Sequence, residues 1–511
     1  MTDWTDGYRV DIDYTHGYYA ELNPLHMQFA MLLAGLTPPE VDTACELGFG
    51  QGVSLNIHAA ASGVAWYGTD FNPAQTAFAQ ELAQASGTKA RCYNDAFIEF
   101  AERSDLPEFD FIALHGIWSW VSEENQRAIL RLIDRRLRVG GVVYVGYNAM
   151  PGWAPVLPLR ELLVRHIDTM TATGSEIGAR VSDARAFLDR LFKTNPAALR
   201  ANLTLSERLS SLAGHDPRYL VHEYLNENWK PQSILEMAEQ LGTARLRFAC
   251  SARWLDAVDA INLTSEQARI LQEVADPVTR EMLRDFIINR FFRRDYWVKG
   301  ARSLTPHDRA ERLRAMRVIL LRDPADIDLK VKGALGEADL LPAIYAPVLD
   351  ALADRVPLTL GEIDDAVRER DVSFALMLEA LTVLMGRGLV SLVQPDARAN
   401  AAADQCAALN QYLMSRAETS GDVSVLASPL TGGGITVGRF QQMFLAECHK
   451  GGGETAQLAA NVWKVLREQG QVLLKDGKPI EGEEANLEEL SRLAGEFVAR
   501  DHGMLHKVWI I

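Results

Sequence analysis

Three glycines follow an acidic residue at alternate positions early in the chain. Glu46 is followed by Gly48, Gly50 and Gly52, directly after a short apolar run. Glycines are needed where a strand turns sharply into a helix and a ligand must approach bare backbone. A dinucleotide loop of the form G-x-G-x-x-G would have its third glycine at the position of Val53. The loop therefore predicts a different ligand or, as the plainer alternative, only a tight turn.

Polar side chains also stand at the ends of the next expected strands. Residues 64–70 read as a strand ending in Asp70, close to the ~20-residue spacing of an acid that binds ribose hydroxyls. A carboxylate suits that role because it accepts two hydrogen bonds from a vicinal diol. Phe71 is then placed to pack on the adenine, and Asp95, after the third strand, to meet the adenine amino group. These residues predict a ligand at the topological switch point of a parallel sheet.

The acidic-x-G-x-G-x-G form resembles motif I of class I methyltransferases, which bind S-adenosylmethionine. The segment after the fourth strand usually sets the acceptor chemistry of these enzymes, and here it is residues 114–118. It contains neither the Asn/Asp-Pro-Pro-aromatic turn of enzymes that methylate adenine or glutamine amides nor the cysteine nucleophile of a 5-methylcytosine enzyme. Methyl transfer to a neutral amine needs instead an aromatic-walled channel that aligns the amine and removes its water.

Aromatic residues on both sides of the glycine loop are candidates for the walls of such a channel. They are Tyr14, Tyr18, Trp118, Trp120 and Tyr147. Asn148 or a tyrosine hydroxyl would accept a hydrogen from the amine. His115 would act either as a weak base or through a hydrogen bond at the edge of the cofactor. The alternative for the tryptophans is packing in the core.

Five motifs together resemble the rickettsial-type protein lysine methyltransferases, class I enzymes with an appended methyltransferase regulatory domain. These motifs are Tyr-Thr-His-Gly-Tyr-Tyr at 14–19, Glu-Leu-Gly-Phe-Gly-Gln-Gly at 46–52, Gly-Thr-Asp-Phe-Asn-Pro at 68–73, Leu-His-Gly-Ile-Trp-Ser-Trp at 114–120 and Tyr-Asn-Ala-Met-Pro-Gly-Trp at 147–153. The resemblance implies that the cofactor contacts Glu46, Gly48, Gly50, Asp70, Phe71, Asp95, Ala96 and His115. It also implies that Tyr14 and Tyr18 lie near the reacting centre, to which the predicted channel adds Trp118 and Asn148 as candidate catalytic residues. Known members of this family methylate lysines of bacterial outer-membrane proteins.

The elements that must position these residues are those of an α/β fold, a Rossmann-like class I methyltransferase sheet followed by mainly helical domains. Residues 41–47, 64–70, 90–93, 109–114 and 142–147 read as its strands, and residues 124–138 as a helix. We expect four units: an aromatic and helical cap (1–40), a methyltransferase domain (41–263), a helical regulatory domain with a winged-helix-like part (264–396) and a C-terminal α/β domain (397–511). The cap is either a flap over the cofactor crevice or a helical cover on the sheet.

Later segments carry no catalytic constellation. Residues 245–251 read as a strand that could complete the sheet, and His222 as structural or as a substrate contact on a lid. Residues 286–297 mix basic and aromatic side chains, which favours an amphipathic helix against a neighbouring domain over a nucleic-acid surface. Residues 374–385, the second helix of the winged-helix-like part, are apolar all round and predict protein contact rather than DNA contact. Residues 428–434 read as a flexible glycine-rich loop.

Composition excludes several other classes of protein. The chain has 511 residues and a net charge of −16, which disfavours a nucleic-acid partner held through its phosphates. Five cysteines form no CxxC pair, so neither a zinc site nor a disulfide framework is indicated, and we expect no metal. No apolar run approaches the ~20 residues of a membrane span, and the acidic N-terminus has no signal core. We expect a cytoplasmic protein, and a homodimer is compatible with the sequence.

These observations favour transfer of a methyl group from S-adenosylmethionine to lysine amines of a protein, with a bacterial outer-membrane protein as the implied substrate. Two alternatives stay open. One is methylation of a small molecule or a surface glycan by the same fold. The other is a non-enzymatic S-adenosylmethionine-binding scaffold whose C-terminal half is the working part.

Overall fold

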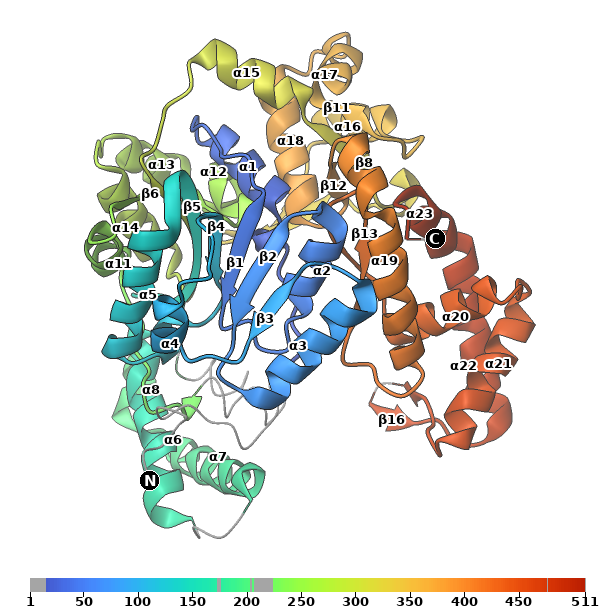
Figure 1. Cartoon of the computed structure of the whole chain (residues 1–511). Coiled ribbons are helices and arrows are strands. Elements are labelled where there is room, and N and C mark those ends of the chain that lie inside the picture. The colour runs from blue at the N-terminus through green and yellow to red at the C-terminus, as the bar shows by residue number, and fades with distance from the viewer. Residues whose placement is uncertain (1–14, 172–175, 203–204, 206–223, 476, 511) are drawn as a thin grey trace.

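A seven-stranded sheet forms the centre of the molecule. The computed structural model describes residues 15–171, 176–202, 205, 224–475 and 477–510 (Figure 1). The strands of the central sheet are β1 (Thr43–Leu47), β2 (Ala65–Thr69), β3 (Arg91–Tyr93), β4 (Phe109–Leu114), β5 (Leu137–Asn148), β6 (Leu246–Ser251) and β7 (Phe292–Lys299). Their order is β3-β2-β1-β4-β5-β7-β6. Strands β1 to β5 are parallel, and β7 is antiparallel to both of its neighbours. The order reverses between β1 and β4, so a ligand is expected above their carboxyl ends.

Alternate residues of the strands pack on the two faces of this sheet. On one face Ala44, Phe111 and Tyr144 pack against the helices η1 (Ala20–Leu22), α1 (Pro24–Leu33), α2 (Val53–Ser62) and α3 (Pro73–Ser86). On the other face Cys45 and Ile112 pack against α4 (Phe97–Glu102), α5 (Glu123–Arg136) and α11 (Ile234–Gly242). Figure 1 shows α2 and α3 on one side of the sheet and α4 and α5 on the other. This arrangement confirms the expected α/β fold class.

Helix α5 shows why these segments fold as they do. Ser122 is its N-cap and accepts a hydrogen bond from the backbone N–H of Asn125, and two glutamates lie in the first turn. Its buried residues Ala128, Ile129, Leu132 and Ile133 form one stripe, which faces the sheet. The helix ends where β5 begins, at Leu137, earlier than the strand expected at 142.

The segment after β5 forms a helical extension at one end of the molecule (Figure 1). Earlier in the chain, a short helix, η2 (Trp118–Trp120), lies between β4 and α5 and is not part of this extension. The extension itself consists of η3 (Ala154–Val156), α6 (Leu157–Met170), α7 (Ile177–Lys193) and α8 (Ala197–Ala201). Its core contains Trp153, Leu159, Leu163, Val181 and Leu188. His222, considered above as structural or as a lid residue, lies outside the described residues.

The middle of the chain returns to the central sheet, contrary to the amphipathic helix predicted over 286–297. Its elements are η4 (Trp254–Ala257), α12 (Asp259–Asn262), α13 (Ser265–Gln272), α14 (Pro277–Ile288) and, after β7, α15 (Pro306–Ala315). The helix ends at Ile288, and Asn289 takes a left-handed conformation that reverses the chain into β7. Tyr296 and Trp297 are then fully buried within the sheet. The methyltransferase sheet therefore draws on residues beyond the boundary expected at 263.

A small three-stranded sheet with three helices follows. The strands are β8 (Arg317–Leu320), β11 (Leu358–Thr359) and β12 (Val390–Val393), and the helices are α16 (Pro342–Ala351), α17 (Leu360–Arg368) and α18 (Phe374–Gly386). Between β8 and α16 lie η5 (Pro324–Asp326) and a separate hairpin of β9 (Lys330–Gly333) and β10 (Gly336–Asp339). The sheet order is β11-β8-β12, so β8, from upstream, pairs with both of the other strands. From α16 to β12 the order is helix, strand, helix, helix, strand, and its assignment as a winged-helix-like part stays a prediction. In α18, residues 380–385 are all buried, but Ala375, Leu376 and Glu379 are exposed, so the expectation of a helix buried all round holds only for its second half.

The C-terminal region packs against the helix that follows the glycine loop. It consists of α19 (Asp396–Ala417), β13 (Val425–Ser428), β14 (Gly433–Thr436), α20 (Arg439–His449), α21 (Thr455–Glu468), β15 (Leu474–Lys475), β16 (Lys478–Pro479), α22 (Glu483–Glu496), η6 (Phe497–Asp501) and α23 (His502–Lys507). Ile57 and Ala60 of α2 share one hydrophobic core with Leu409 and Leu426 of this region. Helix α2 is therefore enclosed between the central sheet and α19, β13 and β14 (Figure 1).

Candidate functional site

The glycine loop joins β1 to α2 at the switch point of the sheet. Gly48, Gly50 and Gly52 all have positive φ, of 68°, 56° and 69°, a conformation that favours glycine. Space is also limited. A Cβ atom on Gly48 would lie 2.5 Å from Ile117 Cδ1, and one on Gly52 would lie 2.4 Å from Ala79 Cβ. The prediction that this loop needs glycines for its backbone shape is confirmed, and the approach of a ligand to that backbone stays a prediction.

Glu46 and Asp70 lie beside the loop, and both carboxyl groups are buried. Asp70 Oδ2 accepts a hydrogen bond of 2.9 Å from the backbone N–H of Gly50, and Oδ1 accepts one of 2.9 Å from that of Asn72. Glu46 Oε2 has no hydrogen-bond partner among the described residues. Such an orphaned oxygen at the edge of a glycine cradle is the expected position for a polar group of a ligand. The site therefore fits an adenosine-type cofactor with a polar tail.

The two carboxyl groups influence each other's protonation. Burial raises the pKa of Glu46 to about 8, and the negative charge of Asp70 contributes to that rise. Burial also raises the pKa of Asp70 to about 6, although the N–H groups of Asn72 and Gly50 act in the opposite direction. The effect of Asp70 on Glu46 means that the two buried carboxyl groups lie close enough to interact, and a cofactor bound by both of them stays a prediction.

The residues after β2 and β3 lie at the same edge of the sheet. Asp95 is partly exposed, and its Oδ2 accepts a hydrogen bond of 2.9 Å from Arg103 Nη1. Ala96 begins α4 and donates its N–H to Glu99 Oε2 at 3.1 Å. Phe71 is half-buried next to Asp70. All three lie where the sequence places an adenine pocket, and their contact with a cofactor stays a prediction.

His115 follows β4 and is packed between aromatic rings. Its Nδ1 shares a hydrogen bond of 2.7 Å with the Tyr144 hydroxyl, and the Tyr19 ring stacks on it with centroids 3.4 Å apart. Burial lowers the pKa of His115 to about 3; the negative charge of Glu21 opposes this shift, and the positive charge of Arg294 adds to it. An imidazole with this pKa is a poor base at neutral pH. The hydrogen-bonding role is therefore the better of the two roles considered for His115.

The aromatic residues predicted as channel walls divide into two groups. Trp118 is fully buried in the core under α5 and donates its indole N–H to Gln240 Oε1 at 3.2 Å, so the core alternative holds for it. Tyr147 is also buried and donates its hydroxyl to Asp295 Oδ2 at 3.0 Å. Trp120 is half-buried and lies over Gly116. A wall role for Trp120 stays a prediction.

Asn148, predicted to accept an amine hydrogen, ends β5 and is almost fully buried. Its backbone N–H donates to Ser119 Oγ at 2.9 Å, and its carbonyl accepts from the backbone N–H of Gln232 at 3.0 Å. The backbone of Asn148 therefore ties the end of β5 to η2 and to the segment before α11. The catalytic role of its side chain stays a prediction.

The two tyrosines expected near the reacting centre have different outcomes. Tyr14 lies outside the described residues. The Tyr18 hydroxyl accepts a hydrogen bond of 2.7 Å from the backbone N–H of Gly434, in β14 of the C-terminal region. The Tyr18 hydroxyl is therefore engaged by the C-terminal region, and its expected place near the reacting centre stays a prediction. The neighbouring Tyr19 is the tyrosine that contacts His115.

Sequence reasoning missed Tyr19, Glu21 and Arg294. Glu21 is buried and forms an ion pair with Arg294 of β7, and its carbonyl accepts a hydrogen bond of 2.5 Å from the Tyr296 hydroxyl. Burial alone would raise the pKa of Glu21, but the positive charge of Arg294, together with His26 and His115, lowers that pKa overall. Only the density of tyrosines in residues 14–19 pointed to this region, and it could not show which ring faces the site.

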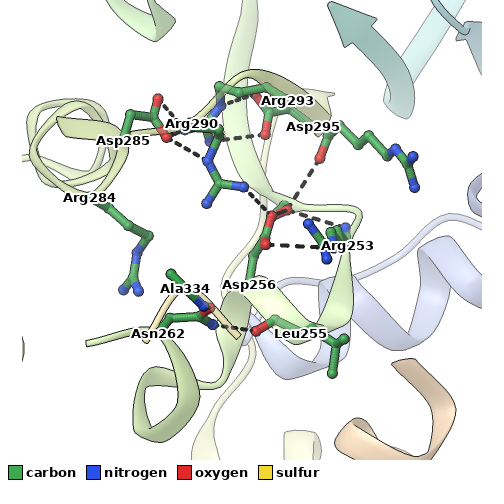
Figure 2. Close-up of polar contacts among 12 residues, drawn as sticks. Arg253, Leu255, Asp256, Asn262, Arg284, Asp285, Arg290, Arg293, Asp295 and Ala334 are labelled. Atoms are coloured by element: carbon green, nitrogen blue, oxygen red, sulfur yellow. Dashed lines mark hydrogen bonds and ion pairs between the residues drawn. The ribbon is translucent and has the colours of Figure 1, made fainter. Parts of the chain in front are cut away.

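A buried network of ion pairs lies behind the site, on the segment that ends in β7 (Figure 2). Arg293 donates to both oxygens of Asp285 at 2.7 Å, to Asp295 Oδ2 at 2.7 Å and to Glu281 Oε2 at 3.0 Å. Arg290 joins Asp285 to Asp256 of η4. Arg290 and Arg293 thus pair with acidic residues inside the protein, which argues against the nucleic-acid surface considered for residues 286–297. Through the Tyr147 hydroxyl the network also fixes β5.

Two family models match the chain. A methyltransferase domain matches residues 44–141, which hold the glycine loop, Asp70, Asp95 and His115. A predicted methyltransferase regulatory domain matches residues 216–299, the segment that supplies β6 and β7. With the sheet order and the site described above, the chain has the fold and cofactor site of an S-adenosylmethionine-dependent class I methyltransferase.

Whole-chain comparisons extend this assignment. The protein sll1526 of Synechocystis sp. is 36% identical over 500 residues, which are 97% of each chain. RP789 of Rickettsia prowazekii is 27% identical over 290 residues, 55% of this chain and 51% of that protein. The structure of PKMT2 from Rickettsia typhi in complex with AdoHcy has a TM-score of 0.71 and 18% identity, and the match covers 98% of this chain and 100% of that one. The chain therefore belongs to the family of methyltransferases with a methyltransferase regulatory domain, together with sll1526.

Within the part of the chain that the structure describes, no helix has the length and apolar character needed to cross a bilayer.

Proposed function

We propose that this methyltransferase transfers the methyl group of S-adenosylmethionine to lysine side-chain amines of a protein substrate, and that this substrate is a bacterial outer-membrane protein. The single observation that carries methyl transfer is the buried pair Glu46 and Asp70 beside three glycines of positive φ, at the switch point of the sheet. The lysine acceptor is supported by the five motifs quoted above and by the similarity in fold to PKMT2 from Rickettsia typhi.

In this proposal the cofactor lies along the carboxyl edge of β1, β2, β3 and β4. Asp70 would hold the ribose hydroxyls, Glu46 the polar tail, and Gly48 and Gly50 would let the backbone approach. Phe71, Asp95, Ala96 and His115 would complete the adenosine pocket. The bound cofactor supplies an electrophilic methyl group on a sulfonium.

The environment of His115 favours an amine acceptor. A sugar hydroxyl needs a base in the transition state, whereas an amine that has lost its ammonium proton needs mainly alignment and exclusion of water. His115 has a pKa of about 3 and is too weak a base for the first task. Its aromatic neighbours Tyr19 and Phe292 supply apolar walls for the second.

Cofactor binding tests the site directly. We expect Asp70→Ala and Gly48→Val each to weaken the binding of S-adenosylhomocysteine by at least ~100-fold in titration calorimetry, because the first removes the diol acceptor and the second drives a side chain into Ile117. Unchanged affinity in both variants would overturn the site. The surface variant Glu40→Gln is the control, since this residue is exposed.

Incubation with labelled S-adenosylmethionine and a bacterial outer-membrane extract, followed by mapping of methyl-lysine, tests the acceptor. Label in lysine side chains of a protein supports the proposal. Label in a small molecule or a glycan would assign a different acceptor to the same site. Cofactor binding without turnover on any acceptor would favour the scaffold alternative.

A further inference from the structure

Residues 16–23, here called the strap, cross the carboxyl edge of the sheet above the glycine loop. The Tyr19 N–H donates to Ser54 Oγ at 2.8 Å, in the first turn of α2, and the Tyr19 carbonyl accepts from His58 Nε2 at 3.1 Å. The ring of His16 packs edge-on against Phe78 of α3, with centroids 5.2 Å apart. The strap therefore spans from α3 across the start of α2 to His115.

The other side of the strap is held by the C-terminal region. Gly434 donates its backbone N–H to the Tyr18 hydroxyl at 2.7 Å, and Asn23 Nδ2 donates to the Thr431 carbonyl at 3.2 Å. These two bonds link residues that are more than 400 positions apart in the sequence. Tyr18 is half-buried at this contact, and loss of solvent around its hydroxyl raises the pKa of that group.

Gly433 and Gly434 contact the strap so closely that neither position has room for a side chain. A Cβ atom on Gly433 would lie 2.7 Å from Asn23 Nδ2 and 2.8 Å from Tyr18 Oη, and one on Gly434 would lie 2.9 Å from Tyr18 Cζ. Neither glycine has positive φ, so their backbone does not demand glycine. The turn predicted as a flexible loop over 428–434 is instead almost entirely buried between β13 and β14. The glycine run thus forms a seat for two strap side chains.

We propose that residues 431–434 of the C-terminal region latch the strap over the cofactor crevice, and that Tyr18 and Asn23 are positioning residues that set how fast the cofactor leaves. This role rests on the cofactor site proposed above. It follows because the same strap presents Tyr19 to His115 at the edge of that site. The strap must lift for the cofactor to pass, and lifting it breaks both bonds to the C-terminal region. The C-terminal region thereby controls residence of the cofactor without contacting it.

Two single substitutions remove the latch and keep the rest of the strap. Tyr18→Phe deletes only the hydroxyl that accepts from Gly434. Asn23→Asp keeps the oxygen that caps α1 through the N–H of Leu25, but it removes the amide donor to Thr431. Tyr412→Phe is the matched control, because the Tyr412 hydroxyl also bonds the C-terminal region to the methyltransferase part, at Glu81 of α3 and away from the strap.

The measurement is release of S-adenosylhomocysteine from the full-length protein, followed by tryptophan fluorescence in a stopped-flow instrument. We expect release to be about fivefold to tenfold faster in Tyr18→Phe and in Asn23→Asp, the effect of one lost hydrogen bond, with the association rate unchanged. In the control, release equals that of the wild type, even where the melting temperatures of all three variants fall alike.

Equal release rates in all four proteins would overturn the latch, and so would an acceleration in Tyr412→Phe as large as in Tyr18→Phe. Either result leaves the cofactor site itself standing, because the wild type still binds. Absence of binding by the wild type would instead refute the proposed site. Gly433→Ala gives an independent check, since its methyl group meets both strap side chains, and it should accelerate release at least as much as Tyr18→Phe.

Discussion

Glu46 is the residue whose ionisation should change most when the cofactor binds. In the free protein its carboxyl group is buried, one oxygen lacks a partner, and its pKa is raised to about 8 by burial and by Asp70. The cofactor carries positive charge on its ammonium and sulfonium groups. A positive charge beside a carboxyl group favours the ionised form and lowers its pKa. Binding near pH 7 should therefore be coupled to loss of a proton from Glu46.

We predict that binding of S-adenosylmethionine at pH 7 releases about one proton in the wild type and far fewer in Glu46→Gln. The number follows because a group of pKa about 8 is mostly protonated at pH 7 and becomes ionised in the complex. Calorimetric titrations in two buffers of different ionisation enthalpy measure it. Glu40→Gln, at an exposed position, should behave as the wild type. Proton release of the same size in Glu46→Gln would show that another group titrates.

The positions of the polar site residues could be predicted from the sequence because they depend on local patterns. Glu46, Asp70 and His115 each follow an apolar run, and the carboxyl ends of parallel strands meet at one edge. The direction of a side chain on an irregular segment has no such rule. Tyr18 and Tyr19 are adjacent, yet one hydroxyl meets Gly434 and the other ring meets His115. The contact that decides between them lies in a distant part of the chain.

At the scale of elements, β7 depends on the guanidinium of Arg293. The guanidinium of Arg293 donates hydrogen bonds to three carboxylates, those of Asp285, Asp295 and Glu281. Asp285 and Asp295 are 1% exposed, and without Arg293 the buried Asp295 would lose this ionic partner while Asp285 would keep its ion pair with Arg290. Removing one partner of a buried ion pair costs far more than the pair contributes net, because the remaining charge is uncompensated.

We predict that Arg293→Met lowers the free energy of unfolding by about 3–5 kcal/mol, measured by urea denaturation. Arg293→Lys should recover only part of this loss, since a single ammonium group cannot reproduce the planar fork of five donors. Arg492→Met is the control: this exposed arginine pairs with Glu489 and Glu496 and should change stability by less than about 1 kcal/mol. Equal losses in the two methionine variants would contradict the argument.

The same element shows where sequence patterns fail. Residues 286–297 have the aromatic and basic composition of an amphipathic helix, but only 286–288 belong to α14, and 292–297 belong to β7. The strand half becomes β7 because β5 and β6 offer two unpaired edges that only the folded sheet contains. The arginines become structural because acids from η4 and α14 surround them. Both causes are contacts with distant parts of the chain. The sequence of residues 286–297 alone therefore has no clear alternating pattern from which the strand could be predicted.

At the scale of the whole molecule, three parts of the chain meet at His58 in α2. Its ring is fully buried, its Nε2 donates to the Tyr19 carbonyl of the strap, and the backbone of Gly432 in the C-terminal region also interacts with it. Burial lowers the pKa of His58 to about 4, although both backbone contacts act to raise it. The folded protein therefore holds this imidazole neutral, where an unfolded chain would take up a proton near pH 6.5.

The lowered pKa of His58 makes the stability of the fold depend on pH in one direction. Between pH 6.5 and about 4 the unfolded chain binds one more proton at His58 than the folded protein, so the contribution of His58 to stability falls as the pH falls. We predict that the difference in unfolding free energy between His58→Asn and the wild type shifts by about 2 kcal/mol in favour of the variant from pH 7.5 to pH 5. Comparing two pH values cancels the fixed cost of the substitution. His307→Asn, at an exposed position, is the control. A difference independent of pH for His58→Asn would mean that water reaches the junction of α2, the strap and the C-terminal region, and that the three do not form a closed core.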